Sequence, residues 1–186
     1  MDSFKDNQRR ASYSIFKTSI GWCGVVVCKK ELRRIFIGYK KNNQLQNHIT
    51  GKFGNDLTKM SSTGELIEKI NLFLSGKKTS FGGCKMDWSS LTPFQGKVLR
   101  AAMKIPYGTV STYGNLSKTI GHPNSARAVG NALSKNPFPL IVPCHRIVRG
   151  DGKVGGFSAG DGEDLKGKLL RLEQKNKSID ILLHHK

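Results

Sequence analysis

The apolar positions near the start of the chain alternate with polar ones. Residues 13–39, YSIFKTSIGWCGVVVCKKELRRIFIGY, are rich in β-branched and aromatic side chains. This pattern predicts two or three strands joined by turns. Residues 40–60 are polar and predict a loop, and the polar residues 1–12 are expected to be flexible.

A helical spacing replaces the alternation in residues 61–78, SSTGELIEKINLFLSGKK. Ser62 and Glu65 match a capping box, and Gly76 stands where a helix is expected to end. The first part of the chain therefore predicts a small antiparallel sheet with a helix.

A second unit begins after a connector at residues 77–91. Thr92 precedes a proline, and Gln95 occupies the third helical position. These residues predict a capped helix that ends before Pro106.

Two shorter helices are predicted next. One is expected to be capped by Ser111 and ended by Gly121, and the other to run from 125 to about 136. Two short helices about a tight turn form a helix-turn-helix pattern, which is typical of proteins that bind duplex DNA.

The last part of the chain contains an apolar segment, a glycine-dense stretch and a helix. The segment from Phe138 to Val142 leads through a proline to Cys144. In residues 147–162, Asp151-Gly152 predicts a hairpin turn.

The final helix is predicted from 163 to 175. Leu165, Leu169 and Leu172 mark its buried face, and Glu173 falls on or beside that face. A carboxylate that points inward needs a partner.

The charge of the chain indicates a polyanionic partner. The formal net charge is +18, with fifteen Lys and Arg against six Asp and Glu in residues 1–84 and sixteen against seven in residues 85–186. The excess is therefore spread over the chain rather than confined to a tail. A folded basic protein of this kind most simply binds a polyanion. A solvated basic surface without a specific partner is the alternative.

Hydropathy and cysteine content indicate the cellular compartment in which the protein is expected. No run approaches the ~20 apolar residues of a membrane helix, and the N-terminal residues lack a signal-peptide pattern. The protein is therefore expected in the cytoplasm or, in a eukaryote, in the nucleus, where disulfides are not expected. A zinc site formed by Cys23, Cys28, Cys84 and a distant histidine is an alternative, although the chain has no pair of CxxC motifs.

Cys144 is followed directly by His145 and Arg146. Adjacent side chains diverge in a strand, so a contact between thiol and imidazole needs a bridging water or a bend, which Pro143 favours. Glu173 could hold one nitrogen of His145 while the other takes the thiol proton through water. Such a relay would ease formation of the thiolate at neutral pH. The alternative is a buried structural cysteine, with His145 and Arg146 on a basic surface.

The stretch IVPCHRIV at 141–148, with SARAVGNAL upstream, resembles the active-site signature of the O6-alkylguanine-DNA alkyltransferases, also called methylated-DNA–protein-cysteine methyltransferases. Residues 92–148 resemble the family's C-terminal domain almost position by position, and residues 13–80 resemble its N-terminal domain more loosely. The resemblance implies an α/β fold of the α+β kind. A ribonuclease H-like N-terminal domain would occupy 1–84, and a mostly helical domain that binds DNA and accepts the alkyl group would occupy 85–186.

The resemblance also implies which residues perform the reaction. Cys144 would be the nucleophile and the permanent alkyl acceptor. His145 would be its water-bridged base, and Glu173 would orient that base. Asn136 would tie the helix-turn-helix to the active-site strand. No metal or other cofactor would take part.

Eight residues are implied at the flipped nucleotide and the surrounding DNA: Tyr113, Ser125, Ala126, Arg127, Gly155, Gly156, Phe157 and Ser158. Tyr113 would help to extrude the nucleotide and would bind the flipped guanine. Arg127 would fill the vacated stack, and the backbone amide of Ser158 would contact O6. Gly155 and Gly156 would let the backbone approach the base.

The implied function is direct reversal of O6-alkylguanine damage in double-stranded DNA, and of O4-alkylthymine, by a monomer that acts once. Many relatives carry tyrosine where this chain has Phe157, so no hydrogen bond is expected from that aromatic wall. Members without the cysteine bind alkylguanine but do not repair it, and Cys144 argues against that class. Two other classes remain open: a helix-turn-helix regulator that leaves Cys144 unmodified, and a cysteine hydrolase that turns over without DNA.

Overall fold

The computed structural model describes residues 11–62, 64–160 and 162–174. The chain divides into two compact units, Met1–Ser75 with Thr79–Asp87 and Gly76–Lys78 with Trp88–Lys186. The domain boundary predicted between residues 84 and 85 stays a prediction. Of the tail expected to be flexible, residues 1–10 lie outside the described residues, and residues 11 and 12 already belong to a strand.

The first unit contains a four-stranded sheet in the order β3-β2-β1-β4. Its strands are β1 (Ala11–Thr18), β2 (Gly21–Cys28), β3 (Glu31–Tyr39) and the short β4 (Thr58–Lys59). The first three are joined by tight turns and pair antiparallel, as the alternation predicts. Because β4 runs parallel to β1, the sheet is mixed rather than purely antiparallel.

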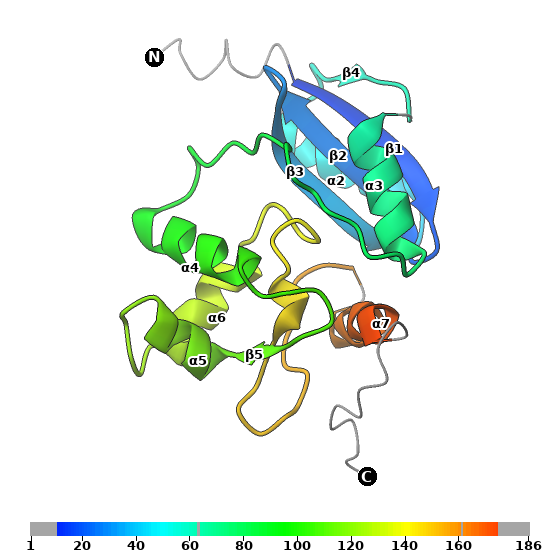
Figure 1. The fold of residues 1–186 in the computed structure, drawn as a ribbon. Coiled ribbons are helices and arrows are strands. Elements are labelled where there is room, and N and C mark those ends of the chain that lie inside the picture. The colour runs from blue at the N-terminus through cyan, green and yellow to red at the C-terminus, as the bar shows by residue number, and fades with distance from the viewer. Residues whose placement is uncertain (1–10, 63, 161, 175–186) are drawn as a thin grey trace. The chain divides into compact units, whose positions relative to one another are not determined.

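Two helices cover opposite faces of this sheet (Figure 1). The predicted one, α3 (Glu65–Leu74), begins after Gly64, and its N-cap makes no side-chain hydrogen bond. The capping box expected from Ser62 and Glu65 is therefore wrong. The helix does end just before Gly76, whose φ of 87° favours glycine.

The other helix, α2 (Asn42–Phe53), lies where the sequence predicts a loop, and that prediction is wrong. Its buried residues are Leu45 and Ile49, one turn apart. They pack in one cluster with Val26 and Phe36 of the sheet. Packing on the sheet thus stabilises a segment whose polar composition gives little helical signal of its own.

The second unit is mostly helical. It contains α4 (Pro93–Met103), α5 (Tyr113–Thr119), α6 (Ala126–Ser134), a 3₁₀ turn η1 (Cys144–Arg146) and α7 (Glu163–Gln174). Two short strands, β5 (Ser111–Thr112) and β6 (Ile147–Val148), pair in parallel. Helices α4, α5 and α6 pack against one another, so α5 and α6 have the arrangement that the helix-turn-helix pattern predicts.

Helix caps decide three of the sequence predictions. Thr92 Oγ1 accepts a hydrogen bond from the Gln95 N–H at 3.2 Å, and the Gln95 side chain accepts one from the Thr92 N–H at 2.9 Å, so this capping box is confirmed. Helix α5 is capped by Thr112 rather than Ser111, since Thr112 Oγ1 accepts a hydrogen bond from the Asn115 N–H at 3.0 Å. Gly121, with φ of 72°, follows the end of α5 as predicted.

The glycine-dense stretch turns at Asp151-Gly152, where the Arg149 N–H donates to the Lys153 carbonyl at 2.9 Å. Strand β6, which precedes this turn, pairs with β5, and the described residues 153–160 after the turn form no strand. The predicted hairpin is therefore reduced to a turn. In the described parts of the chain, no helix is both long and apolar enough to cross a membrane.

The capping box at α4 predicts a stability effect. Thr92→Ala removes the cap acceptor and should lower the free energy of unfolding by about 1 kcal/mol, as measured by urea denaturation. Ser90→Ala, an exposed hydroxyl two residues earlier, is the matched control and should change it by less than about 0.5 kcal/mol. Equal effects of the two substitutions would contradict the role of the cap.

Candidate active site

Cys144 lies at a sharp turn of the chain. Pro143, with φ of −79° and ψ of 61°, precedes the 3₁₀ turn η1, which contains Cys144, His145 and Arg146. The bend predicted at Pro143 is therefore present. The apolar residues before it form a loop with one isolated bridge, between Pro139 and Val142, rather than the expected active-site strand.

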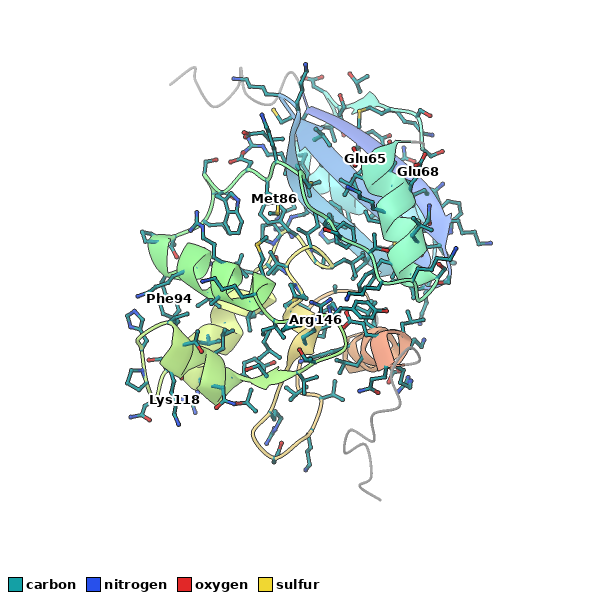
Figure 2. The ribbon with its side chains drawn as sticks, in the orientation of Figure 1. Glu65, Glu68, Met86, Phe94, Lys118 and Arg146 are labelled. Carbon is teal, nitrogen blue, oxygen red and sulfur yellow. The ribbon has the colours of Figure 1, made fainter. Side chains whose placement is uncertain are left out.

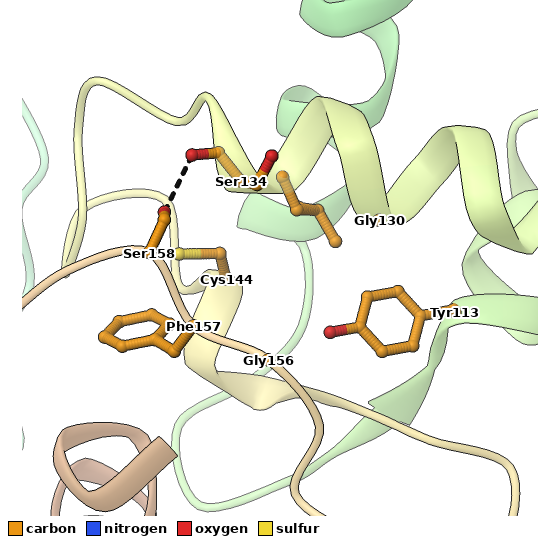
Figure 3. A pocket seen from close by; sticks show the side chains of 8 residues that line it. Tyr113, Gly130, Ser134, Cys144, Gly156, Phe157 and Ser158 are labelled. Atoms are coloured by element: carbon orange, nitrogen blue, oxygen red, sulfur yellow. Dashed lines mark hydrogen bonds between the residues drawn. The ribbon is translucent and has the colours of Figure 1, made fainter. Parts of the chain in front are cut away.

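A pocket of about 360 Å³ opens at Cys144. Its wall combines the start of α5, the second half of α6 and the glycine-dense loop: Tyr113, Gly130, Leu133, Ser134, Cys144, Gly156, Phe157 and Ser158. Figure 3 shows the Tyr113 hydroxyl pointing into the pocket, with Phe157 on the opposite side of the pocket from Tyr113. Ser158 Oγ donates to the Ser134 carbonyl at 2.7 Å and so ties the loop to α6.

The thiol of Cys144 is buried and held by Asn136. Asn136 Nδ2 donates to Cys144 Sγ at 3.2 Å and to the Val142 carbonyl at 3.0 Å, while its Oδ1 accepts from the Phe138 N–H at 2.9 Å. Asn136 thus joins the end of α6 to the cysteine loop. Burial raises the pKa of the Cys144 thiol, and the hydrogen bond from Asn136 acts in the opposite direction. In the free protein the group is therefore a thiol rather than a thiolate at neutral pH.

Behind the cysteine, Glu173 of α7 accepts hydrogen bonds from three groups. His145 Nε2 lies 2.7 Å from Glu173 Oε1. The Arg146 guanidinium donates to both carboxylate oxygens at 2.9 to 3.1 Å, and the Gly108 N–H donates to Oε2 at 2.7 Å. Arg146, which is labelled in Figure 2, also donates to the Ile105 carbonyl at 2.6 Å. The inward carboxylate predicted from the sequence therefore has its partners.

Burial and hydrogen bonding together set the charges of this network. Burial lowers the pKa of His145, and this effect outweighs the hydrogen bond to Glu173, which acts to raise that pKa. Burial would raise the pKa of Glu173, but the hydrogen bonds from His145 and Arg146 more than offset this effect and hold it below the usual value. The site thus holds a neutral imidazole beside a carboxylate, with Arg146 as the counterion. The alternative that placed His145 and Arg146 on a basic surface is wrong, because both are buried.

Sequence reasoning missed two cationic members of the site. Arg146 was not predicted to bind Glu173, and Lys166 of α7 was not considered. Lys166 is fully buried, and its ammonium donates to the Tyr113 hydroxyl at 3.3 Å and to the Gly156 carbonyl at 3.4 Å. Its charge acts to lower the pKa of Cys144. The signal was its spacing of seven residues from Glu173, which places both on one face of α7.

The predicted DNA-contacting residues lie around the pocket rather than all inside it. Arg127 is exposed in the first turn of α6. Gly130 and Ser134 follow it by three and seven residues, so Arg127 lies on the helix face that lines the pocket. Ser125 is the N-cap of α6 without a side-chain cap bond, and Ala126 is the first helical residue; both are half-buried.

The two predicted glycines differ in position. Gly156 lines the pocket. Gly155 has φ of 74°, and a Cβ there would lie 3.1 Å from Arg149 Cγ and 3.5 Å from the Tyr113 ring. The loop therefore requires glycine at 155 to pass beside Tyr113. Cys23, Cys28 and Cys84 form no disulfide, and the described residues contain no cluster of three His, Cys, Asp or Glu that could hold a metal.

Comparison with known sequences agrees with this site. Residues 93–175 match the family described as 6-O-methylguanine DNA methyltransferase, DNA binding domain. A methylated-DNA–protein-cysteine methyltransferase of Methanothermobacter thermautotrophicus is 37% identical over 122 residues, which cover 66% of this chain and 67% of that relative. The protein of the same name from Mycobacterium tuberculosis is 38% identical over 117 residues, covering 63% of this chain and 68% of that relative.

Solved structures extend the likeness to both units. The crystal structure of Mycobacterium tuberculosis OGT in complex with DNA has a TM-score of 0.72 at 29% identity, covering 88% of this chain and 93% of that one. The O6-methylguanine-DNA methyltransferase of Pyrococcus kodakaraensis has a TM-score of 0.67 at 28% identity, covering 87% and 98%. The predicted α+β fold is confirmed, and the chain belongs to the methylated-DNA–protein-cysteine methyltransferase family.

Proposed function

We propose that this protein repairs O6-alkylguanine in double-stranded DNA by transferring the alkyl group to Cys144. The observation that carries the proposal is that Cys144 lines the pocket and is followed directly by His145, whose Nε2 is bound to Glu173. A substrate in the pocket meets the sulfur, and His145 serves as the proton acceptor. Direct-reversal DNA repair by a methylated-DNA–protein-cysteine methyltransferase is the function of the family.

The transfer is a displacement at the alkyl carbon. His145 takes the thiol proton through a water molecule, and the Cys144 sulfur attacks the alkyl carbon. The carbon–O6 bond breaks, its electron pair stays on the guanine, and the guanine takes up one proton from water while His145 releases the thiol proton to water. The products are a thioether and an undamaged base. No group among the described pocket residues is suited to cleave a thioether, so each molecule acts once. The same displacement applies to O4-alkylthymine.

His145 is suited to this task because Glu173 fixes its tautomer. Nε2 is engaged with the carboxylate at 2.7 Å, so in the neutral ring Nε2 carries the proton and Nδ1 is the atom that accepts one. When the ring becomes cationic, the carboxylate stabilises the charge. Lys166 and Asn136 stabilise the thiolate that forms at the same time.

The substrate base has to leave the duplex to reach the sulfur, because Cys144 is buried under the pocket wall. Tyr113 faces the flipped guanine, the Ser158 amide contacts O6, and Arg127 fills the gap in the stack. Phe157 and Gly156 form the wall along which the base enters. One chain supplies the whole pocket, which suits a monomer, with residues 85–186 as the domain that performs the reaction. We infer from the DNA substrate that the reaction takes place in the cytoplasm or, in a eukaryote, in the nucleus.

The acceptor assignment is tested by mass spectrometry. After incubation with duplex DNA containing O6-methylguanine, the protein should gain ~14 Da once, on the peptide that contains Cys144, as covalent transfer requires. Cys144→Ser should gain nothing and should still bind DNA, because the sulfur acts only after docking. A helix-turn-helix regulator would stay unmodified, and a hydrolase would turn over repeatedly. Methyl transfer by the Ser variant to any residue would refute the assignment.

The relay predicts that Glu173→Gln slows alkylation more than it weakens DNA binding. A positioned general base contributes about 100- to 10,000-fold to rate, so a loss of at least ~100-fold is expected. The pH–rate profile should move to higher pH, because the pKa of the Cys144 thiol rises when His145 takes its proton less readily. Asp151→Asn, an exposed carboxylate paired with Arg149, is the matched control and should react normally. Unfolding measurements on the Gln variant separate the rate effect from lost stability. A pH–rate profile that does not move would remove Glu173 from the mechanism.

Arg127 tests base extrusion. Flipping costs a few kcal/mol, so Arg127→Ala should slow repair of duplex DNA by about 100-fold. Reaction with free O6-benzylguanine, which needs no flipping, should stay within a few-fold of normal. Arg127→Lys should rescue only partly, because an ammonium lacks the planar fork of guanidinium.

A simple phosphate contact gives a different result. Lys would then substitute well for Arg127, and the defect of the Ala variant would shrink as salt is lowered. Equal losses on the free base and the duplex would instead indicate that Arg127 serves folding.

A further inference from the structure

The α2 side of the first unit carries cationic side chains that alkyl transfer does not use. From Leu32 to Asn55 the chain contains five Lys and Arg and no Asp or Glu. One of them, Arg33, forms an ion pair with Asp87. Its neighbour Arg34 points to the opposite face of β3. There its guanidinium lies 5.8 Å from the centre of the ring of Phe36, which belongs to the cluster that α2 covers.

Two exposed residues of α2 complete this group. His48 and Lys52 lie one turn apart on the helix. The His48 ring packs edge-on against Phe36, with 5.2 Å between ring centres, and its Nδ1 is hydrogen-bonded to the Tyr39 hydroxyl. When the Tyr39 hydroxyl donates to Nδ1, the proton of the neutral ring lies on Nε2, which can donate to a ligand. We call Arg34, His48 and Lys52 the α2 cationic group.

The members of the α2 cationic group repel one another. After burial, the charges of Lys52 and Arg34 are the causes that lower the pKa of His48, and the charge of Arg34 is the first cause that lowers the pKa of Lys52. Among residues 11–62, 64–160 and 162–174, no carboxylate forms an ion pair with any of the three. An anion placed between them would relieve this repulsion.

We propose that the α2 cationic group binds a phosphate of the DNA backbone. This contact is separate from the DNA contacts proposed for the second unit, which contains Cys144. A guanidinium presents a planar fork that matches two phosphate oxygens, and the ammonium and the imidazole N–H supply further donors. DNA is the polyanion that the proposed function provides, so the inference rests on that function. Because the group reaches phosphate rather than base edges, it adds affinity without sequence preference.

The salt dependence of DNA binding tests this contact. The affinity of the full-length protein for an undamaged duplex is measured over a range of salt concentrations for the wild type and for Arg34→Ala/Lys52→Ala. Each phosphate contact contributes about 0.9 to the slope of log affinity against log salt, so the slope should become shallower by about 1 in the double variant. Lys52→Ala alone, at an exposed helix position, should preserve the fold and give a smaller change in the same direction.

A matched variant separates a specific contact from general charge. Lys17→Ala/Lys59→Ala removes two exposed lysines of the same unit, on β1 and β4, and loses the same net charge. Its slope should stay near that of the wild type, and Arg34→Lys/Lys52→Arg should retain most of the wild-type slope. Equal changes in the two alanine pairs, or no change in either, would overturn the proposal.

Nuclear magnetic resonance of the His48 ring distinguishes DNA from free phosphate. The ring signals should shift on adding duplex DNA and should not saturate with inorganic phosphate at matched ionic strength. Saturation by phosphate without a shift by DNA would overturn the DNA assignment. Arg34→Ala/Lys52→Ala should react with free O6-benzylguanine at the wild-type rate. A wild-type protein that fails to take the methyl group from O6-methylguanine DNA would contradict the proposed function while leaving the slope measurement valid.

Discussion

The buried carboxylate of Glu173 is the interaction on which the active site depends. It joins α7 to the 3₁₀ turn through His145 and Arg146 and to the loop before β5 through the Gly108 amide. Breaking a buried ion pair of this kind costs about 3 to 5 kcal/mol, because one charge is left uncompensated. Arg146 lets Glu173 stay anionic in the interior, and the anion in turn fixes the ring of His145. Stability and reactivity therefore depend on the same three side chains.

The site keeps the cysteine protonated until a base enters. Burial raises the pKa of Cys144, and the nearby Asn136 amide and Lys166 ammonium act only to reduce that effect. A permanently exposed thiolate would react with many electrophiles, and a protein that acts once would be lost each time. A thiol that ionises through His145 after docking avoids this loss. The closed surroundings of the sulfur, with an opening toward Tyr113 and Phe157, direct it to a base in the pocket.

The sequence predicted best where one local signal determines the structure. Thr92 and Gln95 make the expected capping box because proline and an amphipathic helix follow them. The same pattern at Ser62 and Glu65 fails, since the chain turns at Gly64, with φ of 130°, immediately before the helix. Helix α2 was missed because its stability comes from packing on the sheet, which no local pattern records.

The active site likewise contains residues that the sequence could identify and residues that it could not. The neighbours Cys144 and His145 and the inward Glu173 were recognisable from pattern and resemblance. Arg146 and Lys166 were not, because a buried cation depends on tertiary partners: the Glu173 carboxylate for one, and the Tyr113 hydroxyl and Gly156 carbonyl for the other. Long cationic residues are usually exposed, so a basic surface was the alternative for Arg146, and nothing in the composition singled out Lys166.

The protonation state of His145 tests this account most directly. Nitrogen NMR of the free protein reports whether each ring nitrogen carries a proton, over a range from about pH 5 to 8 in which an ordinary histidine titrates. The ring is expected to be neutral at about pH 7, because burial holds its pKa below the usual value, with the proton on Nε2 and an unprotonated Nδ1. A doubly protonated ring at about pH 7, or a neutral ring with its proton on Nδ1, would contradict the role of His145 as the base beside a buried carboxylate.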